Sequence, residues 1–219
     1  TVLNMKINYK ICVLGGGSFG TVLANLAASK GYYVSLWVKD SDKALRINSE
    51  SRNTEYHPEL KLSNNIIASE KLEEIIPESE IIFVATPSKI INDVLDRLTN
   101  FSMDNKMIIS CTKGINENPF MTMSEAIEKH FNNSSIKVGV LSGPNLAKEI
   151  ADEKVAGTVI ASKHADLCNQ AREILSSSTF KIYTSDDIKG IELAGALKNI
   201  YAIISGYCHS LDVGENAIG

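Results

Sequence analysis

Residues 10–40 place a run of glycines between a short apolar stretch and an Ala- and Leu-rich stretch, in the order KICVLGGGSFGTVLANLAASKGYYVSLWVKD. Gly15, Gly17 and Gly20 form a G-x-G-x-x-G pattern, and a second apolar run follows and ends near Val38. A strand, a tight glycine turn, a helix and a second strand in this order are typical of a βαβ unit that binds a dinucleotide. This segment therefore predicts that the fold starts with a βαβ unit and that a ligand binds at the edge of the sheet next to the glycine turn.

Each of the three glycines meets a different requirement of such a unit. Gly15 permits the tight turn, Gly17 lets a pyrophosphate approach the backbone, and Gly20 allows close packing of helix on strand. The N–H groups at the start of the helix are then free to bind an anion. We predict a Rossmann unit that binds a nicotinamide dinucleotide; the alternative is a glycine-rich turn in an unrelated α/β protein.

Short apolar runs alternate with amphipathic stretches along most of the remaining chain. Continuous runs rich in Ile and Val are typical of parallel strands covered on both faces. The alternation predicts an α/β fold with a Rossmann-type, doubly wound, mostly parallel sheet. The expected strands are Lys10–Leu14, Val34–Val38, Ile66–Ala68, Glu80–Ala85, Met107–Cys111, Val138–Leu141, Thr158–Ala161 and Lys181–Tyr183. The expected helices are Gly20–Lys30, Ser41–Ser49, Ile90–Leu98, Pro119–Phe131, Asn145–Ala151 and Ala165–Ser177.

The pattern changes after the last predicted strand. A long, largely apolar helix is predicted over 188–207, and no strand follows it. We expect residues 1–185 to form an NAD(P)-binding Rossmann domain and residues 186–219 to begin an all-α C-terminal domain. That second domain is expected to be truncated, because about thirty residues are too few for an independent core.

Charge, hydropathy and cysteine spacing indicate which partners and which cellular compartment to expect. The 219 residues carry a formal net charge of −4 and no long basic run, so we expect no nucleic-acid partner. No apolar stretch reaches the length of a membrane span, and the start of the chain lacks a signal-peptide pattern. The four cysteines form no C-x-x-C pair and the four histidines show no metal-ligand spacing. We therefore expect a cytoplasmic protein with reduced thiols, no membrane span and no metal.

Polar signals follow several predicted strands, at the edge where open α/β sheets bind ligands. The turn at 85–88 contains Pro87 and small residues, which suit either a passing cofactor or an ordinary proline turn. Lys113 follows a buried strand and either binds a phosphate or carbonyl oxygen or is a surface lysine. The stretch 142–147 begins a short helix whose N–H groups suit an anion, although a capped helix start needs no ligand.

The long predicted helix carries a polar pair on an otherwise apolar stretch. Lys198 and Asn199 share a face with Gly195, because they lie three and four residues after it. A glycine in mid-helix costs about 1 kcal/mol relative to alanine, so it indicates close approach of another group. A partly desolvated lysine has a lowered pKa, more so near Lys113, and can act as a general acid or base. The alternative is a lysine whose stem packs while its ammonium reaches solvent.

Together these motifs resemble soluble, bacterial-type glycerol-3-phosphate dehydrogenase. The resemblance runs from about Ile11 to Gly219, and its most specific part is the pairing of SGPNLAKEI with ELAGALKNIYAI. The other matching stretches are GGGSFGT, LWVKD, NTEYHPELKL, VATPS, CTKGI and LDVGENAIG. The resemblance implies reversible reduction of dihydroxyacetone phosphate to sn-glycerol 3-phosphate with NAD(P)H, a step that supplies glycerophospholipid synthesis.

The resemblance also implies roles for individual residues. Lys198 is expected to exchange a proton with the C2 oxygen, and Lys113 to contact both the substrate and the nicotinamide. Gly143, Asn145 and Asn199 are expected to hold the small phosphorylated substrate with these two lysines. The glycine turn and the resemblance together imply cofactor contacts from Gly15, Gly17, Ser18, Phe19, Gly20, Lys39, Tyr56, Pro87, Lys113 and Ala147.

The end of the second predicted strand bears on the choice of cofactor. Lys39 at the end of the second predicted strand favours the 2′-phosphate of NADPH, whereas Asp40 suits the ribose of NADH.

Phe19 stands where the family often has Trp or Tyr, and the family continues through further helices that bind the substrate phosphate. A shortened helical domain exposes apolar surface, so we expect either a homodimer or aggregation. The alternative functions are a non-catalytic dinucleotide-binding module and a reductase of another phosphorylated or 2-keto substrate. A pure binding module needs the glycine turn but not two converging lysines.

Overall fold

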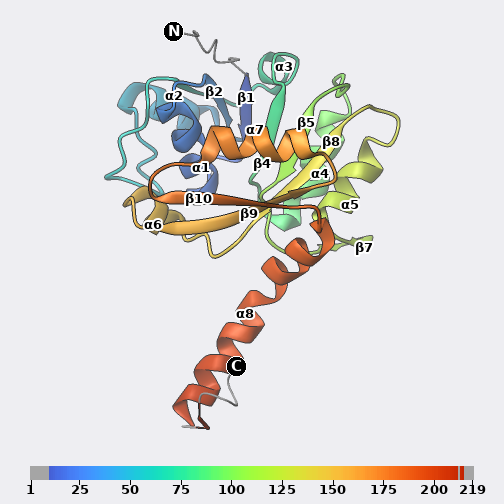
Figure 1. The fold of residues 1–219 in the computed structure, drawn as a ribbon. Coiled ribbons are helices and arrows are strands. Elements are labelled where there is room, and N and C mark those ends of the chain that lie inside the picture. The colour runs from blue at the N-terminus through green and yellow to red at the C-terminus, as the bar shows by residue number, and fades with distance from the viewer. Residues whose placement is uncertain (1–9, 212, 215–219) are drawn as a thin grey trace, which may run out of the picture.

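The computed structural model describes residues 10–211 and 213–214, which form an eight-stranded sheet with helices on both faces (Figure 1). The strand order is β10-β9-β8-β5-β4-β1-β2-β3, and every neighbouring pair is parallel except β8 and β9. The strands are β1 Ile11–Leu14, β2 Val34–Trp37, β3 Ile66–Ser69, β4 Ile81–Val84, β5 Met107–Ser110, β8 Lys137–Ser142, β9 Ala156–Ser162 and β10 Phe180–Ser185. The predicted α/β class and mostly parallel sheet are confirmed.

The two faces of the sheet bury separate hydrophobic cores. Along β1, Ile11 and Val13 pack on one face, and Cys12 and Leu14 pack on the other. This alternation of side chains along each strand explains why the strand segments are apolar throughout. The first core is covered mainly by α1 Ser18–Ser29, α2 Ser41–Glu50 and α7 Ala165–Leu175. The second is covered by α3 Leu72–Ile75, α4 Ile91–Leu98 and α5 Met123–His130.

The predicted helix over Pro119–Phe131 starts too early. A small antiparallel hairpin comes first, formed by β6 Asn116–Glu117 and β7 Phe120–Met121. Helix α5 then begins behind Thr122, which forms a capping box with Glu125: each side chain accepts a hydrogen bond from the other residue's N–H. A Thr followed three residues later by a Glu marks a helix start, and this cue overrides the apolar periodicity upstream of it.

The turn after β8 is braced by the antiparallel neighbour strand. Thr158 of β9 donates to the carbonyl of Ser142 at 3.0 Å and accepts a hydrogen bond from the Asn145 amide at 2.9 Å. The predicted helix at 145–151 starts slightly later, as α6 Ala147–Ala151. The turn 143–146 therefore has a fixed position beyond the carboxyl end of β8.

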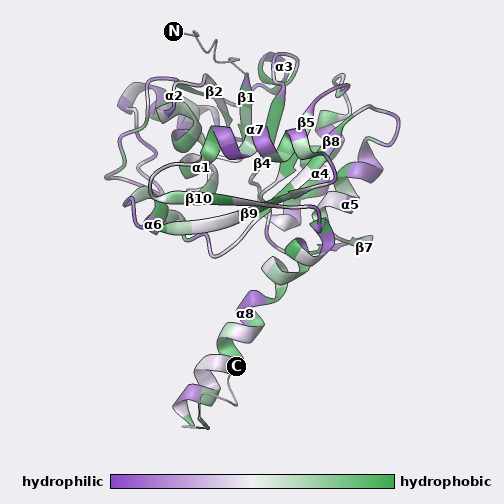
Figure 2. Cartoon of the chain, viewed as in Figure 1, coloured by the Kyte–Doolittle hydropathy of each residue, from purple (hydrophilic) through white to green (hydrophobic). Residues whose placement is uncertain are grey.

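The last element, α8 Ile188–Ser210, leaves the body of the molecule (Figure 1). None of its described residues is buried, although hydrophobic residues recur along it (Figure 2). Leu197, Ile200 and Tyr201 are among its exposed large side chains. Within residues 10–211 and 213–214, no helix has both the length and the apolarity that crossing a membrane requires. The final matching stretch, LDVGENAIG, lies mostly outside the described residues.

All four cysteines are free thiols, and Cys12, Cys111 and Cys168 are buried. Burial raises the pKa of each of these three thiols, which keeps them protonated. In the part of the chain that the structure describes, no three His, Cys, Asp or Glu side chains gather into a group that could hold a metal ion.

Candidate functional site

Two of the three glycines of the G-x-G-x-x-G pattern leave no room for a side chain. Gly15 has a φ of +117°, and a Cβ there would lie 2.7 Å from the carbonyl oxygen of Ala85. A Cβ on Gly20 would lie 1.9 Å from the carbonyl oxygen of Gly15. Gly17 differs, because a Cβ there would meet no atom within 4 Å. Packing thus requires glycine at positions 15 and 20, whereas Gly17 faces open space.

The open space at Gly17 belongs to a cleft of about 660 Å³. The cleft lies where the sheet order reverses, because β1 pairs with β2 on one side and with β4 on the other. Gly17 is also the N-cap of α1, and no side chain caps that helix start. The first N–H groups of α1 are therefore available to an anion, which fits a dinucleotide pyrophosphate.

Most predicted cofactor-contacting residues line this cleft. They are Gly15, Gly17, Ser18, Phe19, Lys39, Tyr56, Pro87 and Lys113. Two are not among its lining residues: Gly20 packs behind the turn, and Ala147 packs against the hydrophobic core.

Charged groups gather at the end of the cleft beyond β2. Asp40 caps α2 by accepting the Lys43 N–H at 3.0 Å, and this hydrogen bond lowers the pKa of the Asp40 carboxyl. The Lys43 ammonium pairs with Glu55 at 2.7 Å and lies 4.4 Å from the centroid of the Tyr56 ring. Lys39 is exposed at the same end of the cleft. The Asp40 carboxylate thus binds the start of α2, and the Glu55 carboxylate binds Lys43.

Two residues that sequence reasoning did not single out hold the glycine turn from outside. Asn53 is buried, and its amide donates to the Gly16 carbonyl at 3.0 Å and to the Thr21 hydroxyl at 2.8 Å. His57 Nε2 lies 3.0 Å from the Ser18 hydroxyl and 2.9 Å from its carbonyl oxygen. Both residues belong to the irregular stretch NTEYHPELKL, where no periodic pattern signals a contact with residues almost forty positions earlier.

Asn53→Ala should loosen the glycine turn. The substitution leaves the Gly16 carbonyl and the Thr21 hydroxyl without their buried donor, and an unsatisfied buried group costs about 1–3 kcal/mol. We expect a lower unfolding temperature and weaker dinucleotide binding, measured by thermal unfolding and by fluorescence titration. Asn64→Ala is the control, because that exposed Asn is outside the turn. Unchanged binding in Asn53→Ala would contradict the bracing role.

Two lysines from distant parts of the chain converge beyond the carboxyl ends of β5 and β8. The Lys113 ammonium donates to the Asn145 carbonyl at 3.4 Å, and the Lys198 ammonium donates to the Gly143 carbonyl at 3.4 Å. The pKa of Lys113 is lowered, first by partial burial and then by the charge of Lys198 and a hydrogen bond with it. Lys113 also lines the cleft, so the pair adjoins the glycine turn.

The approach of α8 to this region depends on Gly195. A Cβ there would lie 2.2 Å from the Ser142 hydroxyl oxygen, which matches the close contact expected from a mid-helix glycine. Asn199, expected on the same face, is exposed to solvent.

Buried polar atoms without a hydrogen-bond partner cluster around the same region. Among the described residues, four such side-chain atoms occur, and three of them belong to Thr86, Ser110 and Asn145. Thr86 lines the cleft, and Ser110 lines a smaller pocket shared with Lys113 and Ser142. Buried polar groups normally find a partner, so this cluster is typical of a site that takes a polar ligand.

Comparison with known families agrees with this geometry. The sequence pattern of the family described as NAD-dependent glycerol-3-phosphate dehydrogenase N-terminus matches residues 10–168. The pattern described as the C-terminus of the same dehydrogenase matches residues 187–219. The chain belongs to the glycerol-3-phosphate dehydrogenase family.

Individual relatives of the glycerol-3-phosphate dehydrogenase family cover nearly the whole chain. The NAD(P)+ glycerol-3-phosphate dehydrogenase of Alcanivorax borkumensis is 43% identical over 209 residues, which is 95% of this chain and 60% of the relative. The enzyme of the same name from Teredinibacter turnerae is 39% identical over 97% of this chain and 62% of its own length. This chain therefore spans about 60% of the length of these curated relatives.

Solved structures of the glycerol-3-phosphate dehydrogenase family have the same fold. The crystal structure of glycerol-3-phosphate dehydrogenase from Coxiella burnetii superposes with a TM-score of 0.85 at 30% identity, covering 96% of this chain and 64% of that one. The Saccharomyces cerevisiae enzyme gives a TM-score of 0.84 at 26% identity, covering 96% of this chain and 65% of that one.

Proposed function

We propose that the protein acts as an NAD(P)-dependent glycerol-3-phosphate dehydrogenase that interconverts dihydroxyacetone phosphate and sn-glycerol 3-phosphate. The observation that carries this proposal is the convergence of Lys113 and Lys198 beside the cleft of the glycine turn. A protein that only binds a dinucleotide has no need of two lysines there, so the pair favours an enzyme over a binding module. Membership of the dehydrogenase family supports the same substrate.

A bound nicotinamide supplies or accepts the hydride at C2 of the substrate, and the protein supplies the remaining requirements. Lys198 exchanges a proton with the C2 oxygen. Lys113, whose pKa is lowered, places a second donor between this oxygen and the cofactor cleft. Gly143 and Asn145 lie at the substrate, and Asn199 orients it.

The organisation proposed from the sequence fits this function. The described residues up to 185 act as the NAD(P)-binding Rossmann domain, and those from 186 onward belong to a helical substrate domain. The partner is a small phosphorylated substrate, and the compartment is the cytoplasm. The exposed apolar side chains of α8 support pairing with a second copy. A clean monomer in gel filtration would contradict the homodimer.

The cleft end beyond β2 favours NADPH over NADH. Because Asp40 caps α2 and Glu55 pairs with Lys43, Lys39 is left to meet a 2′-phosphate. Lys39→Ala is expected to weaken NADPH binding about tenfold, the usual loss for one charge-assisted contact, and to leave NADH binding nearly unchanged. Titration of both cofactors by nicotinamide fluorescence measures the two affinities. Equal losses for NADPH and NADH would show that Lys39 does not discriminate between them.

The function is tested by following oxidation of NADPH and NADH by absorbance with dihydroxyacetone phosphate. Dihydroxyacetone without the phosphate and a phosphorylated 2-keto acid serve as alternative substrates. Turnover that requires dihydroxyacetone phosphate supports the proposal. Turnover with the keto acid alone favours a related reductase. Cofactor binding without turnover on any substrate, by this chain and by one extended to the full length of its relatives, favours the binding module.

A further inference from the structure

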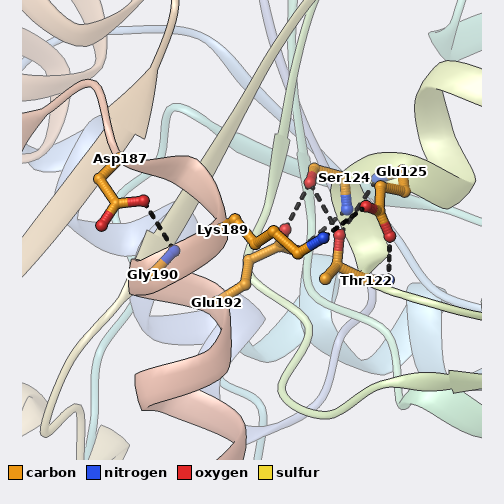
Figure 3. Close-up of polar contacts among 7 residues, drawn as sticks. All are labelled: Thr122, Ser124, Glu125, Asp187, Lys189, Gly190 and Glu192. Carbon is orange, nitrogen blue, oxygen red and sulfur yellow. Dashed lines mark hydrogen bonds and ion pairs between the residues drawn. The ribbon is translucent and has the colours of Figure 1, made fainter.

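Helix α8 carries Lys198 to the site, and none of its described residues is fully buried. Ile191, Leu193 and Ala196 are only partly buried, so hydrophobic packing alone constrains the rotation of the helix and its position along its axis only weakly. Its start is fixed locally by Asp187, which accepts the N–H of Gly190 at 2.8 Å (Figure 3). Contacts to the rest of the molecule must therefore determine where Lys198 lies.

The main polar contact is made by Glu192. One carboxylate oxygen accepts the backbone N–H of Ser124 at 2.9 Å, and the other accepts the Ser124 hydroxyl (Figure 3). Ser124 is only 5% exposed, so this double hydrogen bond is sheltered from water. It joins two helices whose bonded residues are 68 positions apart in the chain.

The contact suits a carboxylate for a second reason. Ser124 lies in the first turn of α5, where backbone N–H groups have no partner within the helix and the helix dipole favours a negative charge. The Thr122–Glu125 capping box satisfies the neighbouring donors, and Glu192 satisfies that of Ser124. Glu192 thus adds to the cap of α5 from another helix.

The same turn of α8 faces Lys113. Glu192, Gly195 and Lys113 line one small pocket. Gly195 contacts Ser142 one turn further along, and Lys198 follows six residues after Glu192, about 9 Å along the helix axis. Glu192 and Gly195 hold the helix at two points on one face, so the helix can neither rotate about its axis nor slide along it. This places Lys198 at the Gly143 carbonyl.

We propose that Glu192 is a positioning residue: by binding Ser124 at the start of α5, it fixes α8 and so holds Lys198 beside Lys113. The geometry is independent of the reaction, whereas its purpose rests on the function proposed above. The other link between these helices, Lys189 to Glu125 at 3.4 Å, joins side chains that are 71% and 45% exposed. Such exposed ion pairs contribute little, so Lys189 provides a matched control on the same turn.

The test measures the pKa of Lys113 in the full 219-residue chain. Lysines are reductively methylated with an isotope label and titrated by NMR, and the Lys113 signal is assigned from its loss in Lys113→Arg. In Glu192→Ala we expect the pKa of Lys113 to rise toward the ordinary lysine value, because the charge of Lys198 moves away. If Glu192 acted only through its own charge, its removal would lower that pKa, so the sign of the shift separates the two effects.

Matched variants complete the experiment. Glu192→Gln retains an acceptor for the Ser124 N–H and should keep the pKa of Lys113 low, and Lys189→Ala should also leave it low. Ser124→Ala removes one of the two bonds and should give an intermediate rise, which keeps the proposal testable if Glu192→Ala does not fold. In a Lys198→Met background, Glu192→Ala should cause little further change, because the group it positions is gone.

An unchanged or lower pKa of Lys113 in folded Glu192→Ala would overturn the proposal. So would a shift of equal size in the Lys198→Met background. None of these measurements needs substrate or turnover, so a failure of the proposed dehydrogenase activity would be seen separately in the cofactor oxidation assay.

Discussion

Lys198→Ala is expected to lower turnover of dihydroxyacetone phosphate by about 10²–10⁴-fold, the usual contribution of a positioned general acid. NADPH affinity should change little, because Lys198 is not among the residues that line the dinucleotide cleft. Absorbance assays give kcat and KM, and fluorescence titration gives the cofactor affinity. The proton-transfer role predicts a loss mainly in kcat.

Lys198→Arg separates proton transfer from charge. Arginine keeps a positive charge near Gly143 but does not release its proton in a protein. We expect Lys198→Arg to be nearly as inactive as Lys198→Ala. Substantial activity in the Arg variant would mean that Lys198 acts as a fixed charge and not as an acid or base.

The second large effect is expected at Gly20. The Cβ of Gly20→Ala would lie 1.9 Å from the Gly15 carbonyl oxygen, a backbone atom that cannot move without shifting the turn. Overpacking of this kind costs about 3 kcal/mol. In a chain of this length we expect the unfolding temperature to fall by about 10 °C. Thermal unfolding followed by circular dichroism measures the change.

Gly17→Ala is the matched substitution in the same turn. Gly17 has an extended backbone with φ of −82°, and its Cβ would meet no protein atom. We expect an unchanged unfolding temperature but dinucleotide binding at least about tenfold weaker, because the methyl group occupies space needed by the pyrophosphate. Equal effects of the two substitutions on stability would contradict the different roles assigned to these glycines.

The sequence allowed most of the sheet to be predicted because its strands are buried on both faces. A fully buried strand reads as one apolar run, as in Ile81–Val84, and needs no knowledge of its neighbours. The predicted start of α5 at Pro119 is wrong because it follows apolar periodicity alone, whereas the capping box at Thr122 places the start of the helix at Met123. The antiparallel step from β8 to β9 had no sequence signal at all.

The candidate site was predictable where chemistry follows a strand end. Lys113 lies three residues after the end of β5, and Gly195 with Lys198 stands out on an apolar helix. The contacts of Asn53 and Glu192 were not predictable in this way. Each joins segments far apart in the chain, and a buried hydrogen bond leaves no periodic trace in either segment.

The strand order also has a consequence for synthesis of the chain. β2 and β3 add in turn to one side of β1, and β4, β5, β8, β9 and β10 add in turn to the other. No strand has to insert between two that already pair, so each can dock as it leaves the ribosome. The residues that line the dinucleotide cleft all lie within 15–113. A nascent chain can therefore complete its cofactor cleft well before Lys198 has been translated.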